Sequence, residues 1–275
     1  MSFRIKKIIE EITPPVLINI YKEKFGKYGF FGNYSSWEEA TKTSEGYDSE
    51  IILNKVKDAL LKVKSGEASY ERDSVLFDKI EYSWPLLTAL LWIALKNGNK
   101  MNLVDFGGSL GSSYFQNRFF LTHLNELKWN IVEQSNFVDC GKQYFENDHL
   151  KFYYNLNDCK KEHNSDIILF LSVIQYLEKP YALLEEIITY GFKYIVFDRT
   201  PFLEYGKDRI TVQQVPPKIY KASYPAWFFN RDKFLNFFIR RGYEVVAEFD
   251  TSDKSNIASS GFKGFIFKRA THNVQ

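Results

Sequence analysis

From residue 101 onward, short apolar runs alternate with segments whose apolar residues recur at helical spacing. The expected strands are 101–106, 128–133, 151–155, 166–172, 193–198, 243–249 and 261–268. The expected helices are 112–127, 136–146, 157–163, 180–190 and 230–241. This alternation predicts an α/β domain on a doubly wound parallel sheet, in which ligands bind at the carboxyl ends of the strands.

The first 80 residues follow a different pattern, and we expect an N-terminal helical and lid segment over 1–80 ahead of the α/β domain of 81–275. Helical spacing predicts helices over 3–12, 49–65, 70–80 and 85–96. Ser36 and Glu39 stand at the spacing of a capping box. Within the α/β domain, the stretch 199–226 holds four of the eight prolines and is expected to be irregular.

Charge and composition exclude several classes of protein. The net charge is +2, from 36 basic and 34 acidic residues, so no nucleic-acid partner is expected. The two cysteines and four histidines fit no metal-binding spacing, so no metal site is expected. No apolar run is long enough to span a membrane, and no unbroken apolar stretch follows the N-terminal lysines, so we expect a cytoplasmic protein.

A glycine-rich turn follows the first expected strand and reads Asp105-Phe106-Gly107-Gly108-Ser109-Leu110-Gly111. Glycine permits the tight turn and the close approach of a ligand, and the amides at the start of the next helix face whatever binds there. Glu133 ends the second expected strand, 22 residues after Gly111. A carboxylate at this place can accept hydrogen bonds from both hydroxyls of a ribose.

The glycine spacing differs from the G-x-G-x-x-G of dinucleotide sites, which brings the backbone against a pyrophosphate. Its form, D-x-G-x-S-x-G, resembles the first motif of class I methyltransferases that use S-adenosylmethionine (SAM), with Ser109 at the place of the middle glycine. The segments 166–180 and 261–268 resemble the same enzymes. The resemblance implies a Rossmann-like, mostly parallel, seven-stranded sheet with an antiparallel last strand, and SAM as the cofactor.

Further segments resemble a bacterial family of methyltransferases associated with surface-polysaccharide gene sets. They are GFFGNYSSWEEA, YERDSVLFD, DFGGSLGSSYFQNR, VIQYL, DRTPF and SYPAWFF. The resemblance covers nearly the whole chain. It implies methyl transfer to a sugar hydroxyl of a surface glycan or its precursor.

The resemblance also implies which residues bind the cofactor. They are Asp105, Gly107, Gly108, Ser109, Gly111, Glu133, Gln134, Asn155, Leu156 and Ser172. The turn residues would shape the methionine and ribose end, and Glu133 would bind the ribose. Gln134, Asn155 and Leu156 lie where the adenine is usually held. For Asn155 and Ser172, capping of a strand end is an equally good interpretation.

Catalysis on a sugar hydroxyl, a poor nucleophile, is helped by a general base. Asp198, which ends the fifth expected strand, is the first candidate, and an ion pair with Arg199 or Arg209 is the alternative. The stretch 199–227 is long enough to be functional. We expect its Arg209 and Tyr224 to serve catalysis at the acceptor, because aromatic rings stack on sugars and arginine binds acidic ones.

Other interpretations remain open for the lid, the N-terminus and the function. Residues 70–73 are either a lid over the cofactor or a solvated helix start. The apolar stripe within residues 1–15 lies either weakly on a membrane surface or against the α/β domain. The alternative functions are a nicotinamide-dependent enzyme, although no Tyr-x-x-x-Lys pair is found, and an inactive methyltransferase-like scaffold in glycan assembly.

Overall fold

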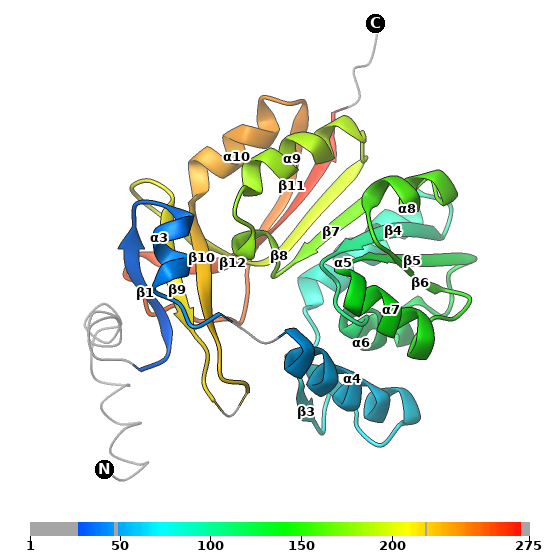
Figure 1. Cartoon of the computed structure of the whole chain (residues 1–275). Helices are drawn as coiled ribbons and strands as arrows, with labels where there is room; N and C mark the ends of the chain where they lie inside the picture. Colours follow the sequence, from blue (N-terminus) through cyan, green and yellow to red (C-terminus); the bar gives the residue numbers. More distant parts are fainter. Residues whose placement is uncertain (1–26, 47–48, 218, 271–275) are drawn as a thin grey trace, which may run out of the picture.

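The computed structural model describes residues 27–46, 49–217 and 219–270, and a seven-stranded sheet forms its centre (Figure 1). In spatial order the strands are β6 (Leu150–Tyr153), β5 (Glu126–Val132), β4 (Lys100–Phe106), β7 (Ile167–Leu171), β8 (Tyr194–Leu203), β12 (Ser260–Arg269) and β11 (Tyr243–Asp250). Neighbours from β6 to β8 pair in parallel, whereas β12 pairs antiparallel with both β8 and β11. The predicted Rossmann-like sheet with an antiparallel last strand is confirmed.

Helices cover both faces of this sheet. They are α5 (Trp84–Lys96), α6 (Ser112–Leu121) and α7 (Ser135–Tyr144) on one face, and α8 (Leu156–Glu162), α9 (Pro180–Thr189) and α10 (Arg231–Ile239) on the other. A hydrophobic core lies on each face: the first core under α5, α6 and α7, and the second core under α8, α9 and α10. Successive residues of a strand point to opposite faces, so Leu103 and Leu169 enter the first core while Val104 and Phe170 enter the second. This explains why the central strands are apolar without alternation.

A second, three-stranded sheet branches from the end of β8. Its strands are β10 (Ser223–Asn230), β9 (Arg209–Gln214) and β1 (Gly29–Tyr34), and the short helix α3 (Trp37–Lys42) covers it (Figure 1). Strand β8 continues past Asp198, and its last residues, Phe202 and Leu203, pair with β10 in parallel. The prediction of an irregular stretch over 199–226 is therefore wrong. Pro216 and Pro217 fall in the connection between β9 and β10, and the flanking segments form strands.

The segment before the main sheet is only partly helical. The helix α4 (Ser49–Ser65) confirms the predicted range, and Ser36 caps α3 by accepting a hydrogen bond from the Glu39 amide. The predicted helix over 70–80 is wrong, because a hairpin of β2 (Tyr70–Arg72) and β3 (Val75–Phe77) forms there. Its turn holds Asp73 and Ser74 at φ angles of 53° and 67°. The helix expected over 3–12 lies outside the described residues.

Within the described ranges, no helix is long and apolar enough to cross a membrane.

Candidate functional site

The glycine-rich turn forms the floor of the site at the carboxyl end of β4. Gly107 has a φ of +71°, and a Cβ on it would lie 2.4 Å from a methyl carbon of Val173. A Cβ on Gly108 would lie 2.6 Å from the carboxyl carbon of Asp105. The turn thus has no room for side chains, and its backbone is what a ligand meets. Ser109, at the place of a glycine in the motif, also takes a positive φ of 53°, which is strained for serine.

Asp105 lies beneath this turn rather than in the cleft. Its Oδ2 accepts a hydrogen bond of 3.0 Å from the Trp129 indole, and its Oδ1 has no partner among the described residues. Burial raises the pKa of Asp105 to about 7, against the opposing effect of the indole hydrogen bond. Gly111 is likewise below the cleft, where it caps α6 in the left-handed conformation and faces Leu150.

Glu133 follows β5 directly, and its carboxylate lies beside the turn. Its Oε2 accepts a hydrogen bond of 2.9 Å from the Gln134 amide. Partial burial raises its pKa, although that hydrogen bond opposes the rise. The second carboxylate oxygen can still accept hydrogen bonds from a ligand.

One cleft of about 980 Å³ joins the turn and Glu133 to the ends of β7 and β8. Of the predicted site residues, it is lined by Gly107, Gly108, Ser109, Glu133, Gln134, Ser172, Asp198 and Tyr224. The hairpin residues 70–73 also line it. The structure therefore brings together residues from segments that lie far apart in the sequence.

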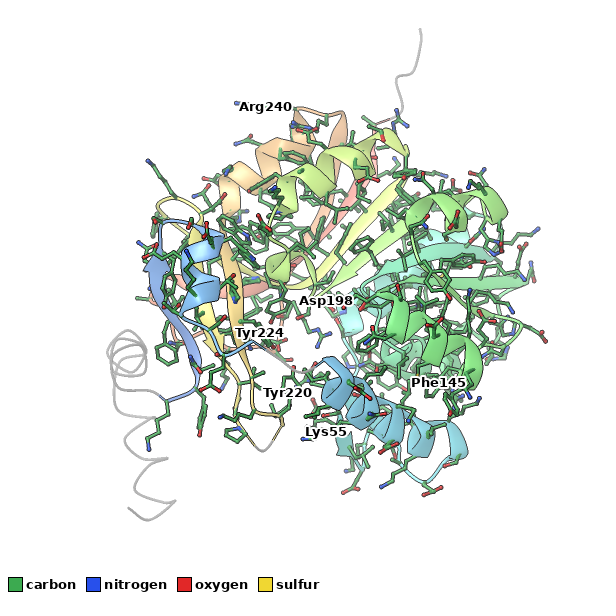
Figure 2. All side chains as sticks on the ribbon, in the orientation of Figure 1. Lys55, Phe145, Asp198, Tyr220, Tyr224 and Arg240 are labelled. Carbon is green, nitrogen blue, oxygen red and sulfur yellow. The ribbon has the colours of Figure 1, made fainter. Side chains whose placement is uncertain are left out.

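Asp198 is the last residue of β8 that pairs with β7, and Figure 2 shows it near the centre of the molecule. It is only 2% exposed, and its Oδ1 accepts a hydrogen bond of 2.9 Å from the Arg199 amide. Burial raises its pKa, opposed by the charge of Arg199 and a hydrogen bond from Ser83. A carboxylate with a raised pKa, facing a cleft, is suited to accept a proton.

Tyrosines form the wall of the cleft next to the second sheet. The ring of Tyr224 lies edge-on to that of Tyr176 at 5.3 Å, and its hydroxyl is 3.4 Å from that of Tyr220 (Figure 2). The hydroxyl of Tyr176 donates to Gln213 at 2.8 Å. Burial raises the pKa of both Tyr176 and Tyr224, so both stay neutral.

Besides Asp105 and Gly111, three more predicted site residues do not line the cleft. Asn155 caps α8 by accepting a hydrogen bond of 2.9 Å from the Asp158 amide, in line with the capping alternative. Leu156 is buried in the second core. Arg209 lies in β9, where its Nε donates to the Gly32 carbonyl at 2.8 Å. The structure thus gives no support to a role of Arg209 at the acceptor.

Two features of the site were missed in the sequence. Glu71 ties the hairpin to the start of α6, because its carboxylate accepts from the Ser112 hydroxyl and, at 2.6 Å, from the Ser74 amide. Arg199 was considered only as an ion-pair partner, yet it lines the cleft itself. Its place directly after Asp198, at a strand end, was the available signal.

Comparisons with known proteins give similarities to solved structures alone. No model of a known protein family matches the chain, and no curated protein matches its sequence. Several solved structures have a similar fold. The magnesium protoporphyrin IX methyltransferase of Synechocystis, with bound SAM, is 10% identical over 83% of this chain and 100% of its own, with a TM-score of 0.45.

Two further solved structures resemble the chain to a similar degree. The N-terminal domain of EvdMO1, with bound S-adenosylhomocysteine, is 10% identical over 82% of this chain and 98% of its own, with a TM-score of 0.48. An amino pentose methyltransferase of Micromonospora echinaspora is 12% identical over 69% of this chain and 92% of its own, with a TM-score of 0.45. At TM-scores below 0.5 these likenesses decide neither activity nor substrate. The fold assignment rests on the strand order itself, which is that of a Rossmann-like α/β domain.

Proposed function

We propose that this chain is a SAM-dependent methyltransferase that methylates a sugar hydroxyl of a bacterial surface glycan or its precursor. The observation that carries the proposal is the single cleft shared by the glycine-rich turn, Glu133 and Asp198. In it, a nucleoside-binding set at the ends of β4 and β5 lies next to a buried carboxylate at the end of β8. This is the pairing that an alkyl transfer needs, because the reaction depends mainly on alignment of two reactants.

The cofactor half of the cleft fits SAM in its shape and its donor set. A Cβ at Gly107 or Gly108 would collide with neighbouring atoms, so the bare backbone is available to the amino-acid end of the cofactor. Glu133 would accept hydrogen bonds from the two ribose hydroxyls, and Gln134 and Ser172 line the walls on either side. When bound, SAM supplies a methyl group that is activated by the positive sulfur. The glycine spacing lacks the pattern that a pyrophosphate requires.

The acceptor half of the cleft supplies a proton acceptor and aromatic walls. Asp198 would take the proton of the attacking hydroxyl or orient that hydroxyl, with the Arg199 amide holding the carboxylate in place. Tyr224 and Tyr176 offer ring faces and edges against which a sugar ring packs. The hairpin lines the cleft next to α6, to which Glu71 ties it, and would limit the access of water to the bound reactants.

Glu133→Ala tests the cofactor assignment by calorimetry with SAM. The variant loses two hydrogen bonds to a charged group, each worth about 1.5–3 kcal/mol, so the affinity should fall at least about tenfold. Glu126→Ala is the matched control, because Glu126 starts the same strand and pairs with Lys100 on the surface. Unchanged SAM affinity in a folded Glu133→Ala protein contradicts the proposal.

The same calorimetry separates the two alternative functions. Binding of NAD in place of SAM would identify a nicotinamide enzyme. If the protein binds neither SAM nor NAD, the remaining alternative is the inactive scaffold in glycan assembly. SAM binding alone, followed by mass spectrometry of the products with candidate glycans, supports the methyltransferase.

A further inference from the structure

Arg199 has an unusual backbone for a residue that lines the cleft. It adopts a left-handed φ of 53°, directly after the last residue of β8 that pairs with β7. Its amide donates to the Asp198 carboxylate, and its carbonyl accepts from Gln175 at 3.3 Å. The strain of this conformation is thus held in place on both sides, as is common at functional sites.

The guanidinium of Arg199 lines the cleft and has no hydrogen bond or ion pair with any other residue in the described part of the chain. Guanidinium carries five N–H donors in a planar fork, and leaving them unused at a half-buried position is costly. The hydroxyl-bearing rings of Tyr70 and Tyr176 line the same cavity. The N–H donors of the Arg199 guanidinium are therefore available to a ligand in the cleft.

Three carboxylates from three different elements line the same cleft as Arg199 and act on it electrostatically. They belong to Asp73 in the hairpin turn, Asp198 at the end of β8 and Asp253 in the connection from β11 to β12. Together they raise the pKa of Arg199, although burial opposes the rise. The Oδ2 atom of Asp253 is buried and without a hydrogen-bond partner among the described residues.

This arrangement restricts the charge of the acceptor. Even with Arg72 and Lys254, which also line the cleft, the carboxylates of its lining outnumber the cations. An acidic sugar or a sugar phosphate would therefore meet net repulsion. A protonated amine could pair with the aspartates, but it has no lone pair with which to accept a hydrogen bond from the Arg199 guanidinium. A hydroxyl group both donates and accepts hydrogen bonds, so neighbouring hydroxyls of one ring can use the arginine and the aspartates together.

We propose that Arg199, Asp73 and Asp253 bind the acceptor, and that this acceptor is a neutral, polyhydroxylated sugar ring at the methylated position. Arg199 donates to one ring hydroxyl, and the two aspartates accept from its neighbours. The proposal rests on the function proposed above and specifies its substrate class. It also replaces Arg209 by Arg199 as the arginine at the acceptor.

The experiment compares matched sugars in the presence of SAM. Methyl glycosides of glucose, galactose and mannose are each paired with the corresponding uronate, which differs by a carboxylate at C6. Release of S-adenosylhomocysteine measures turnover, and saturation-transfer NMR measures binding. We expect at least one neutral glycoside to bind and react, and its uronate to be at least about tenfold poorer. A preference for the uronates, or no binding by any neutral glycoside, overturns the inference.

Variants identify the residues responsible. Arg199→Lys keeps the charge but loses the planar fork, so KM for the neutral glycoside should rise by about tenfold or more, with SAM affinity within about twofold of the parent. Asp253→Asn should weaken the discrimination against the uronate. Arg240→Lys is the control, because Arg240 lies at the end of α10, away from the cleft (Figure 2).

The outcomes separate this inference from the proposed function. Failure of the parent protein to bind SAM contradicts the methyltransferase assignment. Normal SAM binding with an unchanged KM in Arg199→Lys contradicts only the acceptor site. If Arg199→Lys does not fold, Asp253→Asn serves as the test. The measured quantity is the ratio of turnover with the neutral glycoside to turnover with its uronate, and an unchanged ratio refutes the site.

Discussion

Asp105 is completely buried under the glycine-rich turn, and ionising it there is costly. Its folded-state pKa of about 7 lies above the ordinary value of 3.8, so the folded protein holds this proton more tightly than the unfolded chain does. Protonation of Asp105 thus contributes to the free energy of unfolding. This contribution, on the order of 4 kcal/mol, is fully present below about pH 4 and is lost as the pH rises through about 7. Asp105→Asn should remove this loss.

Urea unfolding between pH 5 and pH 9 checks the prediction for Asp105. The parent should lose stability over this range relative to Asp105→Asn, whereas the exposed Asp148→Asn should follow the parent. Parallel profiles for the parent and Asp105→Asn would mean that the carboxyl ionises without penalty.

Asp198 is the residue whose charge the proposed chemistry needs. Asp198→Asn keeps an oxygen that can accept from the Arg199 amide, so the backbone should hold its shape. The methyl-transfer rate should fall by roughly 10²–10⁴-fold while SAM binding is retained. Because burial raises the pKa of Asp198, the parent's rate should drop as the pH falls through that raised pKa, and the variant should lack this limb. Initial rates measured across pH 5 to 9 decide, and a rate within about twofold of the parent excludes a catalytic role.

The residues of the cofactor half could be predicted because they form a local motif. The turn of Gly107 and Gly108 and the strand-end Glu133 are fixed by spacing along the sequence. Arg199 could not be assigned in this way. The role that we propose for it rests on a left-handed backbone and on Asp73 and Asp253, which come from distant segments and line the same cleft only in the fold.

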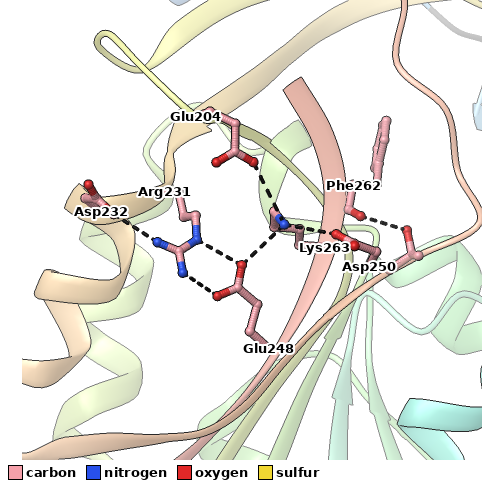
Figure 3. Close-up of polar contacts among 8 residues, drawn as sticks. Glu204, Arg231, Asp232, Glu248, Asp250, Phe262 and Lys263 are labelled. Atoms are coloured by element: carbon pink, nitrogen blue, oxygen red, sulfur yellow. Dashed lines mark hydrogen bonds and ion pairs between the residues drawn. The ribbon is translucent and has the colours of Figure 1, made fainter. Parts of the chain in front are cut away.

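Among the elements, β12 carries a partly buried charge network at the base of the loop that holds Asp253. Lys263 lies within 4 Å of carboxylates of Glu204, Glu248 and Asp250, and Arg231 binds Glu248 from α10 (Figure 3). The Lys263 side chain is only 16% exposed. Its removal would leave Glu204 and Asp250 without this cation and would leave Glu248 with Arg231 alone.

Lys263→Met should therefore destabilise the fold by about 1–3 kcal/mol, because it leaves partly buried charges uncompensated. Lys268→Met on the same strand is the control, since the pair of Lys268 with Glu244 is more exposed and should contribute about 0–1 kcal/mol. The free energy of unfolding in urea measures both. Equal losses in the two variants would show that the network does not act as a unit.

The type of each element could be predicted where the apolar residues recur with a clear period. The prediction failed where the conformation of a turn determines the structure. The main-sheet strands and the helix α4 follow from apolar spacing alone. The hairpin at 70–77 has no such signal, because its turn uses Asp73 and Ser74 in the left-handed conformation instead of glycine or asparagine. In 209–230, the prolines obscured two strands, β9 and β10, which pair with each other and, on their outer sides, with β1 and β8.

At the scale of the whole molecule, β8 belongs to two sheets and places the acceptor half of the cleft between them. Strand β1 pairs with β9 about 180 residues away in the sequence, and no local pattern encodes such a pairing. The prediction therefore contained the seven-stranded sheet but lacked the second sheet, whose strand β1 pairs with a distant part of the sequence.

Residues 1–15 lie outside the described ranges, and their membrane contact stays a prediction from the apolar stripe and the neighbouring lysines. Each basic residue contributes only about 1 kcal/mol near an anionic surface, so binding should be weak and sensitive to salt. Co-sedimentation with anionic vesicles at low salt, with and without residues 1–15, tests it. Equal behaviour of the two proteins, whether both pellet or both stay in solution, refutes the contact.

Asn256 joins the second sheet to the loop that carries Asp253. Its side chain accepts from the Phe30 amide at 2.7 Å and donates to the Phe30 carbonyl at 2.8 Å, both in a buried setting. Asn256→Ala would leave both backbone groups of Phe30 without partners. The expected cost is about 2–4 kcal/mol, since each buried group loses its hydrogen bond.

The function should respond to Asn256→Ala at one half of the cleft only. The loop and β1 border the acceptor half, whereas the glycine-rich turn and Glu133 belong to the main sheet. Methyl transfer should therefore fall in the variant, while SAM affinity stays within about twofold of the parent at a temperature where the protein is folded. Asn125→Ala, at an exposed position, is the control and should change stability by no more than about 0.5 kcal/mol. Equal stability of the two variants would show that the link to Phe30 does not hold the sheets together, and a parallel loss of SAM affinity would show that the two halves are not independent.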